Sequence, residues 1–272
     1  MTAPIPRDIP DLPAIPGIPV LMPSHVPATA VRAPVRRPLA AGYRLLVALI
    51  AATAVAVELT LGSPLRTLSL FAVQSNILLA LVFLLSARRA WTARRPLPSA
   101  LTGATLLYAV ITGLVYHLLL AKGASTFALP GVLTGEATEP TGWHAITNQV
   151  LHTAMPVAVL LDWLLLTAPG RLRLRRAATW MLYPFAYLAF ALVRGVFLPT
   201  DTPARYLYPF LDITQHGYKS VLGNALLIGL AMYALAIVLV ALDHVRLNPI
   251  RNRVRIRRRR AKTGFRLQPP VG

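Results

Sequence analysis

Residues 146–167 read ITNQVLHTAMPVAVLLDWLLLT, an apolar run long enough to cross a lipid bilayer as one helix. The run nevertheless carries His152, Pro156 and Asp162 among its aliphatic residues. An aspartate at the centre of a membrane helix costs about 2.5–3.5 kcal/mol on insertion scales. Because a helix that faces only lipid has no use for such residues, this run predicts a buried polar site between several membrane helices.

The composition of the whole chain agrees with a membrane protein. Of its 272 residues, 56% are hydrophobic and only 14% are charged, whereas a soluble domain has about 25% charged residues. The chain has no cysteine, which excludes disulfide bonds, thiolate nucleophiles, cysteine-ligated zinc and iron–sulfur clusters. The net charge of +19 lies in tails and connectors beside apolar runs. There it orients the chain in a membrane, so nucleic acid is not the expected partner.

Six apolar runs are long enough to cross about 30 Å of hydrocarbon. The predicted fold class is therefore all-α, a polytopic membrane bundle with six transmembrane helices. The connectors between the runs are polar or contain proline or glycine, as loops do. The predicted spans are Leu45–Leu61, Thr67–Ala87, Ala100–Ala121, Ile146–Thr167, Ala177–Leu198 and Val221–Asp243.

Basic residues are concentrated in alternate connectors. The connectors Arg88–Arg95 and Arg171–Arg176 are rich in arginine, as are both tails, whereas the other connectors carry few basic residues and several acidic ones. The positive-inside rule then predicts a multi-pass protein of the cell membrane with both termini in the cytoplasm. An even number of spans requires the same placement, since both termini must then lie on one side.

Composition divides the chain into three regions. Residues 1–39 are rich in proline and lack a long apolar run, which predicts a disordered cytoplasmic tail. Residues 40–245 form the transmembrane domain, whose partners are membrane lipids. Residues 246–272 form a basic cytoplasmic tail. Each basic residue near a membrane surface gains about 1 kcal/mol from anionic lipid, so this tail is predicted to contact anionic headgroups.

Polar residues recur at one depth in five spans and in the last external loop. The direction in which each span is threaded places them near the outer face. Such a layer predicts an internal polar site near the outer leaflet for a lipid-like or other small ligand. Structural alternatives stay open for each: interhelical hydrogen bonds for the amides, a satisfied core position for the histidine, and a headgroup or Glu58 as the partner of the arginine. The candidate site residues are Glu58, Gln74, Ser75, Asn76, His117, Asn148, His152, Arg194 and Asp212.

Helical spacing adds detail to this layer. Asn148 and His152 stand four residues apart and share one helix face. Pro156 lacks an N–H and removes the backbone hydrogen bond to the carbonyl of His152. A kink with a free carbonyl beside an imidazole is therefore expected there.

Other polar and aromatic residues favour structural roles. Asp162 lies near the cytoplasmic edge, where pairing with an arginine is expected rather than chemistry. Tyr183 and the segment Tyr206–Phe210 fit the aromatic belts found at membrane interfaces.

Several short motifs occur in a fixed order along the spans. They are FAVQSN at 71–76, LH at 151–152 with Pro156 and then DW at 162–163, Tyr183-Pro184, Arg194-Gly195, YPFLD at 208–212 and Gly217-Tyr218. Over roughly residues 42–245 they resemble the bacterial Pr-six-Pr family of integral membrane proteins. That family is distantly similar to the androgen-induced membrane hydrolases, which cleave esters of fatty acids with hydroxy fatty acids through an intramembrane Thr and His.

The resemblance implies a lipid-ester hydrolase in which the histidine corresponds to His152. The threonine of the family falls at position 72, which is Ala72 here. An alanine cannot be a nucleophile, so Ser75 would have to replace it, with His152 as its base. Gln74 or Asn76 would then donate to the oxyanion. Glu58 or Tyr116 would orient the imidazole.

Three functions compete for this site. The first is a fatty acyl ester hydrolase, and the second is a non-catalytic lipid or small-molecule binding or transport protein, which Ala72 favours. The third is a b-type haem protein ligated by His117 and His152, but no second histidine pair lies at inner depth. No cofactor and no metal site is predicted. The absence of lysine from the predicted spans excludes a Schiff-base cofactor such as retinal.

Overall fold

The computed structural model describes residues 35–120, 142–200, 202 and 205–246, and every regular element within these ranges is helical. Six helical segments there are long and apolar enough to cross a membrane, which confirms the predicted fold class for this part of the chain. The predicted tails lie outside the described residues, except for 35–39 and Arg246. The first span begins at Pro38, slightly before the predicted domain boundary. The six segments are Pro38–Leu61, Phe71–Trp91, Ser99–Leu118, Gly142–Leu166, Leu174–Phe197 and Ile213–Val245.

The third and fourth spans contain π-helical turns, and the fifth is broken between α8 and α9. The elements in chain order are α2 (Pro38–Leu61), α3 (Pro64–Ser69), α4 (Phe71–Trp91), α5 (Ser99–Val115), the π-helix η1 (Tyr116–Leu120), α6 (Gly142–Gln149), the π-helix η2 (Val150–Ala154), α7 (Met155–Leu161), the π-helix η3 (Asp162–Leu166), α8 (Leu174–Trp180), α9 (Leu182–Phe197), the 3-10 helix η4 (Pro209–Leu211) and α10 (Ile213–Val245).

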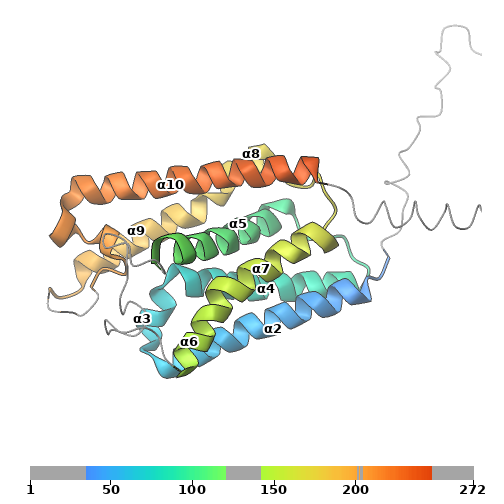
Figure 1. The fold of residues 1–272 in the computed structure, drawn as a ribbon, viewed down its shortest axis with the longest axis horizontal. Coiled ribbons are helices and arrows are strands. Elements are labelled where there is room, and N and C mark those ends of the chain that lie inside the picture. Colours follow the sequence, from blue (N-terminus) through green and yellow to red (C-terminus); the bar gives the residue numbers. More distant parts are fainter. Residues whose placement is uncertain (1–34, 121–141, 201, 203–204, 247–272) are drawn as a thin grey trace, which may run out of the picture. The chain divides into compact units, whose positions relative to one another are not determined.

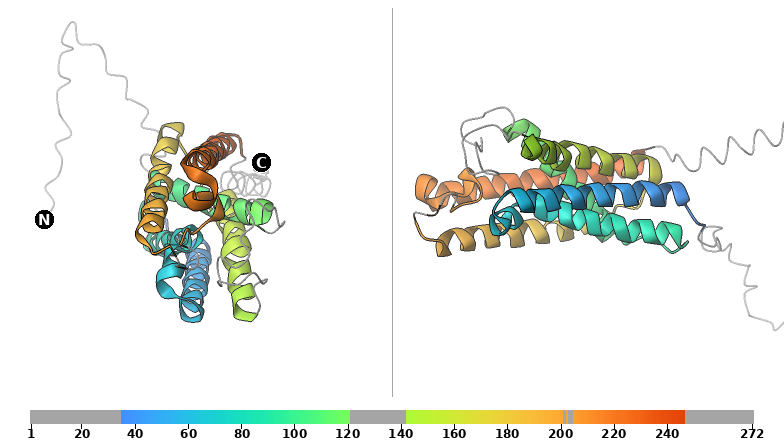
Figure 2. Two further views of the ribbon diagram at one scale, coloured as in Figure 1. Left: turned by 90° about the vertical axis from the view of Figure 1, so that its left-hand side faces the viewer. Right: turned by 90° about the horizontal axis from the view of Figure 1, so that it is seen from below.

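Successive spans run in opposite directions and form a bundle (Figure 1). Helices α2 and α4 lie side by side, α5 packs against α4 and α7, and α10 packs against α5 and α8 (Figures 1 and 2). The fourth span, from α6 to η3, crosses obliquely in front of the others in Figure 1. We call the end where α2 finishes and α6 begins the Glu58 end, and the opposite end the Arg44 end.

The second span starts later than the hydropathy of the sequence predicts. Leu70 has an extended backbone, with φ −75° and ψ 134°, and it separates the short helix α3 from α4. The amide of Leu70 donates to the carbonyl of Thr67, and its own carbonyl accepts from the amide of Gln74. The chain therefore turns at Leu70, and Gln74, Ser75 and Asn76 lie in the first two turns of α4.

The last span starts earlier than predicted. The Asp212 carboxylate caps α10 by accepting the backbone N–H groups of Thr214 at 2.9 Å and Gln215 at 3.3 Å. Gly217 interrupts the helix with φ 71° and ψ 161°, a conformation that favours glycine. The apolar run beginning at Val221 is therefore only the later part of the helix.

The surface of the bundle is apolar where a membrane would cover it. Helix α10 exposes a row of leucines, including Leu222, Leu226 and Leu230. Inside the bundle, Gly103 on α5 packs against the indole of Trp180 so closely that an added Cβ would overlap its ring. Glycine is therefore needed at this contact between α5 and α8.

Arg44 and Asp162 form an ion pair at the Arg44 end. The Arg44 guanidinium donates to both carboxylate oxygens of Asp162, at 2.7 and 3.1 Å, and the Thr167 hydroxyl donates to the same carboxylate at 3.0 Å. A bidentate Arg–carboxylate pair satisfies both partners. The prediction that Asp162 pairs with an arginine is confirmed.

Asp243 near the end of α10 joins three parts of the bundle at the same end. Its carboxylate is fully buried and accepts from the Trp163 indole at 3.0 Å and from the backbone N–H groups of Arg171 and Leu172 at 2.7 and 2.8 Å. The Arg246 guanidinium contacts it at 2.8 Å. One buried carboxylate thus holds α10, η3 and the connector that precedes α8.

Candidate functional site

A group of polar side chains near the Glu58 end is buried between four of the spans. We call it the polar cluster. All of its members except Tyr116 and His144 are at least nine-tenths buried. Polar residues in membrane spans are costly, and those that face the interior of the bundle often belong to functional sites. The members are Glu58 on α2, Ser75 and Asn76 on α4, Thr112 on α5, Tyr116 on η1, His144, Thr147 and Asn148 on α6, and His152 on η2.

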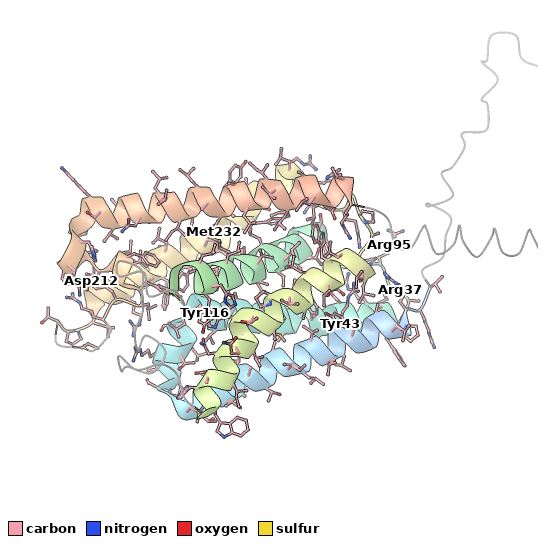
Figure 3. The ribbon with its side chains drawn as sticks, viewed as in Figure 1. Arg37, Tyr43, Arg95, Tyr116, Asp212 and Met232 are labelled. Carbon is pink, nitrogen blue, oxygen red and sulfur yellow. The ribbon has the colours of Figure 1, made fainter. Side chains whose placement is uncertain are left out.

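Two of these residues lie in π-helical turns. Tyr116 belongs to η1 and His152 to η2, and their rings stack with centroids 4.6 Å apart and planes inclined by 28°. Figure 3 labels Tyr116 where the end of the third span meets the fourth. Single π-helical turns inside membrane and soluble helices are frequent at functional sites, because the extra residue re-aims side chains. Both turns direct an aromatic ring into the same contact.

One nitrogen of His152 is engaged and the other is not. Its Nδ1 lies 3.0 Å from the backbone carbonyl of Asn148, one turn earlier. A carbonyl only accepts, so Nδ1 carries the proton in the neutral ring and Nε2 presents a lone pair. Among the described residues, Nε2 has no hydrogen-bond partner. His152 is therefore held in a tautomer that can accept a proton or a hydrogen bond at Nε2.

The Asn76 side chain connects α4 to the fourth span. Its Nδ2 donates to the carbonyl of Ala72 at 2.8 Å and to the carbonyl of Leu151 at 3.4 Å. Its Oδ1 is buried and has no partner among the described residues. Turning the amide over would set Oδ1 against the Ala72 carbonyl, so this oxygen is the one left unpaired.

Asn148 shows the same incomplete pairing. Its Nδ2 donates to the Tyr116 hydroxyl at 2.7 Å, while its Oδ1 is buried without a partner among the described residues. Turning this amide over would pair Oδ1 with the hydroxyl and leave Nδ2 unpaired instead. Buried polar atoms are nearly always hydrogen-bonded, so each exception requires an explanation such as a ligand or water.

Glu58 has partners that the sequence did not indicate. Its carboxylate accepts a short hydrogen bond from the Thr147 hydroxyl and lies 3.2 Å from Nδ1 of His144. The sequence suggested Arg194 or the imidazole of His152 as the partner of Glu58, and neither contact is present among the described residues. His144, Thr147 and Asn148 occupy one face of α6 at spacings of three and four residues. That spacing, one turn before His152, is the signal that could have identified them.

Ser75 does not contact His152. Its hydroxyl donates to the carbonyl of Ala72 at 3.0 Å and lies 3.4 Å from the hydroxyl of Thr112. A serine nucleophile needs its proton within hydrogen-bond reach of the base. Ser75 and His152 both belong to the polar cluster, but no hydrogen bond connects them.

His117 lies outside the cluster, at an exposed position. Its Nε2 lies 2.9 Å from the hydroxyl of Thr153, which donates its own proton to Oε1 of Gln149 at 2.9 Å. The hydroxyl therefore accepts from His117. The rings of His117 and His152 each pack against Tyr116.

Arg194 and Asp212 flank the connector between the last two spans. The Arg194 guanidinium donates to the carbonyl of Arg205 at 3.0 Å, and the Arg205 guanidinium returns a hydrogen bond to the carbonyl of Gly195 at 2.5 Å. Asp212 caps α10. Both residues lie on elements other than those that form the polar cluster.

Gln74 also points away from the cluster, toward a group of aromatic rings. The Tyr183 hydroxyl donates to Oε1 of Gln74 at 3.0 Å, and the Tyr187 hydroxyl donates to the carbonyl of Ser69 at 2.9 Å. The Tyr208 hydroxyl accepts from the amide of Phe71 at 3.3 Å. The prediction that Tyr183 and Tyr206–Phe210 form interfacial belts is wrong for Tyr183 and Tyr208, because they face inward and bind α4.

Neither a metal site among the described residues nor a match to a known protein indicates a function. Among the residues that the structure describes, no group of three or more His, Cys, Asp or Glu side chains is arranged to hold a metal ion. No protein-family model, curated protein or solved structure matches the chain. The function must therefore be argued from the polar cluster itself.

Proposed function

We propose that this chain is a multi-pass protein of the cell membrane that binds or transports a lipid-like or other small molecule through the polar cluster, without covalent catalysis. The observation that carries this proposal is that the buried side-chain amides of Asn76 and Asn148 each keep one polar atom without a partner among the described residues. An unpaired buried acceptor costs about 1–3 kcal/mol. A ligand that brings hydroxyl or amine donors recovers that free energy on binding.

The position of the cluster indicates where such a ligand enters. Most of the described arginines lie at the Arg44 end, including Arg37 and Arg95 in Figure 3, whereas the labelled Asp212 lies at the other end. The positive-inside rule assigns the Arg44 end and both termini to the cytoplasm. The polar cluster then lies toward the outer leaflet, the side from which an amphipathic ligand would approach it.

The state of the serine favours binding over hydrolysis. The hydroxyl of Ser75 is bound to a backbone carbonyl of its own helix, and position 72 is an alanine. Neither residue offers an activated nucleophile to His152. A binding protein needs neither residue to be activated.

Mass spectrometry of lipids that copurify with the protein tests the proposal. Asn148→Leu removes one hydrogen-bonding group, and the loss of about 1.4 kcal/mol weakens the affinity about tenfold, which reduces the amount of copurified ligand. The matched control is Asn224→Leu, because the Asn224 side chain binds the carbonyl of Phe210, at 3.4 Å, away from the polar cluster. Equal amounts of every copurified molecule in the wild type and in both folded variants would contradict the proposal.

The second candidate is a fatty acyl ester hydrolase, as the Pr-six-Pr resemblance implies. The observation that favours it is the free Nε2 of His152, which suits a general base. Hydrolysis would require the Ser75 side chain to rotate away from Ala72 on substrate binding. A serine-reactive fluorophosphonate probe would then label the wild type and fail to label folded Ser75→Ala and His152→Ala. Absence of labelling and of ester cleavage in the wild type removes this candidate.

A further inference from the structure

A carboxylate and an imidazole meet beside the first span at the Glu58 end. The Glu58 side chain is only 4% exposed, and the His144 side chain that contacts it is 23% exposed. Glu58 lies on a helix whose neighbouring residues are mostly aliphatic or alanine. Acidic groups and histidines paired inside membrane domains are characteristic of proton pathways, because a charge without a partner is costly there.

The net charge of the pair depends on its proton count. With one shared proton, the pair is neutral, with a carboxylate facing an imidazolium. Without that proton, the carboxylate is left with a net negative charge in an apolar layer. A second proton gives a carboxylic acid beside an imidazolium, with a net positive charge. Since burial penalises net charge, the gain or loss of a proton destabilises the contact between the two side chains.

Other charged or titratable groups near Glu58 are few. On the described elements that pack against α2 at this end, they are Arg66 on α3 and His152 on η2, in addition to His144 on α6. Helix α4 has no titratable side chain before Arg88, and α7 has none. The hydrogen-bonded contacts of the Glu58 carboxylate are those with His144 and Thr147. The proton count of the pair is therefore the variable part of the charge that the Glu58 carboxylate itself contacts.

The same short helix carries the polar groups of the proposed ligand site. Helix α6 places His144 and Thr147 on Glu58, and the next residue, Asn148, on the Tyr116 hydroxyl. The π-helix η2 follows directly and separates α6 from the rest of the span. A π-helical turn interrupts the regular hydrogen bonding of an α-helix and is frequent at functional sites.

We propose that Glu58 and His144 form a proton-binding site, and that uptake of a second proton from water releases α6 from α2 and displaces Asn148. Protonation of the carboxylate beside an imidazolium removes the attraction between them. His144 then turns toward water, to which its side chain is already partly open. Proton binding and ligand binding would be coupled through α6, a step that depends on the proposed function. The proton site itself does not depend on it.

Infrared difference spectroscopy between pH 8 and pH 4, with no added ligand, tests the proton site. The wild type is expected to gain a protonated-carboxyl band on acidification that is absent from Glu58→Gln. In His144→Asn the carboxylate loses the imidazole that faces it, so the band is expected to appear at a higher pH than in the wild type. The matched control His117→Asn removes a histidine that contacts Thr153 and no carboxylate, and it is expected to behave as the wild type. A band unaffected by Glu58→Gln, or the same titration in His144→Asn and the wild type, would overturn the proposal.

Hydrogen–deuterium exchange tests the release of α6. After correction for the intrinsic pH dependence, amides of 143–149 are expected to exchange at least tenfold faster at pH 4 than at pH 8 in the wild type, and equally at both in Glu58→Gln. If the carboxyl band appears on acidification but the amides of α6 exchange no faster, protonation of Glu58 does not release α6. Neither measurement uses a ligand, so both can fail while the copurification result stands, and the reverse also holds.

Discussion

The buried carboxylates at one end of the bundle and the buried amides at the other differ in how completely they are paired. At the Arg44 end, the carboxylates of Asp162 and Asp243 have close partners on every side, including arginines, a hydroxyl, an indole and backbone N–H groups. At the Glu58 end, the oxygens of Asn76 and Asn148 have none among the described residues. Complete pairing stabilises a fold, whereas incomplete pairing leaves binding capacity. The comparison predicts that substitutions at the first end reduce stability and those at the second reduce binding.

The largest effect is expected from Asp243→Ala at the Arg44 end. It removes the acceptor for Trp163, for the Arg246 guanidinium and for two backbone N–H groups. Breaking a buried charge pair on one side costs about 3–5 kcal/mol. The free energy of unfolding in detergent, from a denaturant titration, measures this loss. A loss under about 1 kcal/mol, the scale of an exposed ion pair, would show that the network does not stabilise the bundle.

Gly103→Ala, also nearer the Arg44 end, is expected to have the next largest effect. The new methyl group would overlap the indole of Trp180, and overpacking of this kind costs about 1–3 kcal/mol. Gly229→Ala is the control, because nothing lies within 4 Å of its added Cβ. Thermal unfolding of both variants in one detergent compares them. Similar melting temperatures would contradict the described contact between α5 and α8.

Thr147→Val tests whether a hydrogen bond at the Glu58 end also stabilises the fold. The substitution preserves the shape of the side chain but removes a hydrogen bond to the buried carboxylate of Glu58. Hydrogen bonds to charged groups contribute about 1.5–3 kcal/mol. We expect a loss near the lower figure, measured as a shift of the denaturant midpoint. If stability is unchanged, Glu58 is not held by this hydroxyl.

The smallest effect on stability is expected from Asn76→Leu. Asn76 already contains an unpaired buried oxygen, and an apolar group of similar size removes that penalty while losing its two hydrogen bonds to backbone carbonyls. Exchanging such a group is close to neutral, so the free energy of unfolding should change by less than about 0.5 kcal/mol. Copurified ligand should nevertheless decrease. A strongly destabilised Asn76→Leu would show that the polar side chains at the Glu58 end stabilise the fold, as the carboxylates at the Arg44 end do.

The sequence predicted the position of residues along the spans well, but it predicted poorly which neighbours their side chains face. Hydropathy located six spans, and the charge pattern led to the pairing of Asp162 that the structure confirms. The depth of a residue follows from its distance along a span. The neighbour that it faces depends on how each helix is rotated about its axis. Gln74 and Ser75 are adjacent in sequence, yet one contacts Tyr183 and the other contacts Thr112.

Local backbone departures account for most of the remaining differences. The extended backbone at Leu70 and the π-helical turns of η1 and η2 each rotate the residues that come after them. None of them has a clear signal in one sequence, although Pro156 predicted an irregularity close to η2. Because His144 lies before the apolar run that defined the fourth span, the sequence did not suggest it as a partner for Glu58. A span defined by its capping and spacing, rather than by hydropathy alone, would have included it.

The contacts of Asp243 have a consequence for the order in which the protein is made. This residue lies at the end of the last span, yet it satisfies the backbone of the connector between the fourth and fifth spans and the indole of Trp163. Until α10 has been synthesised and inserted, those groups lack this acceptor. A nascent chain interrupted before residue 243 thus displays donors without this acceptor at the Arg44 end. These exposed donors distinguish an incomplete chain from a finished one.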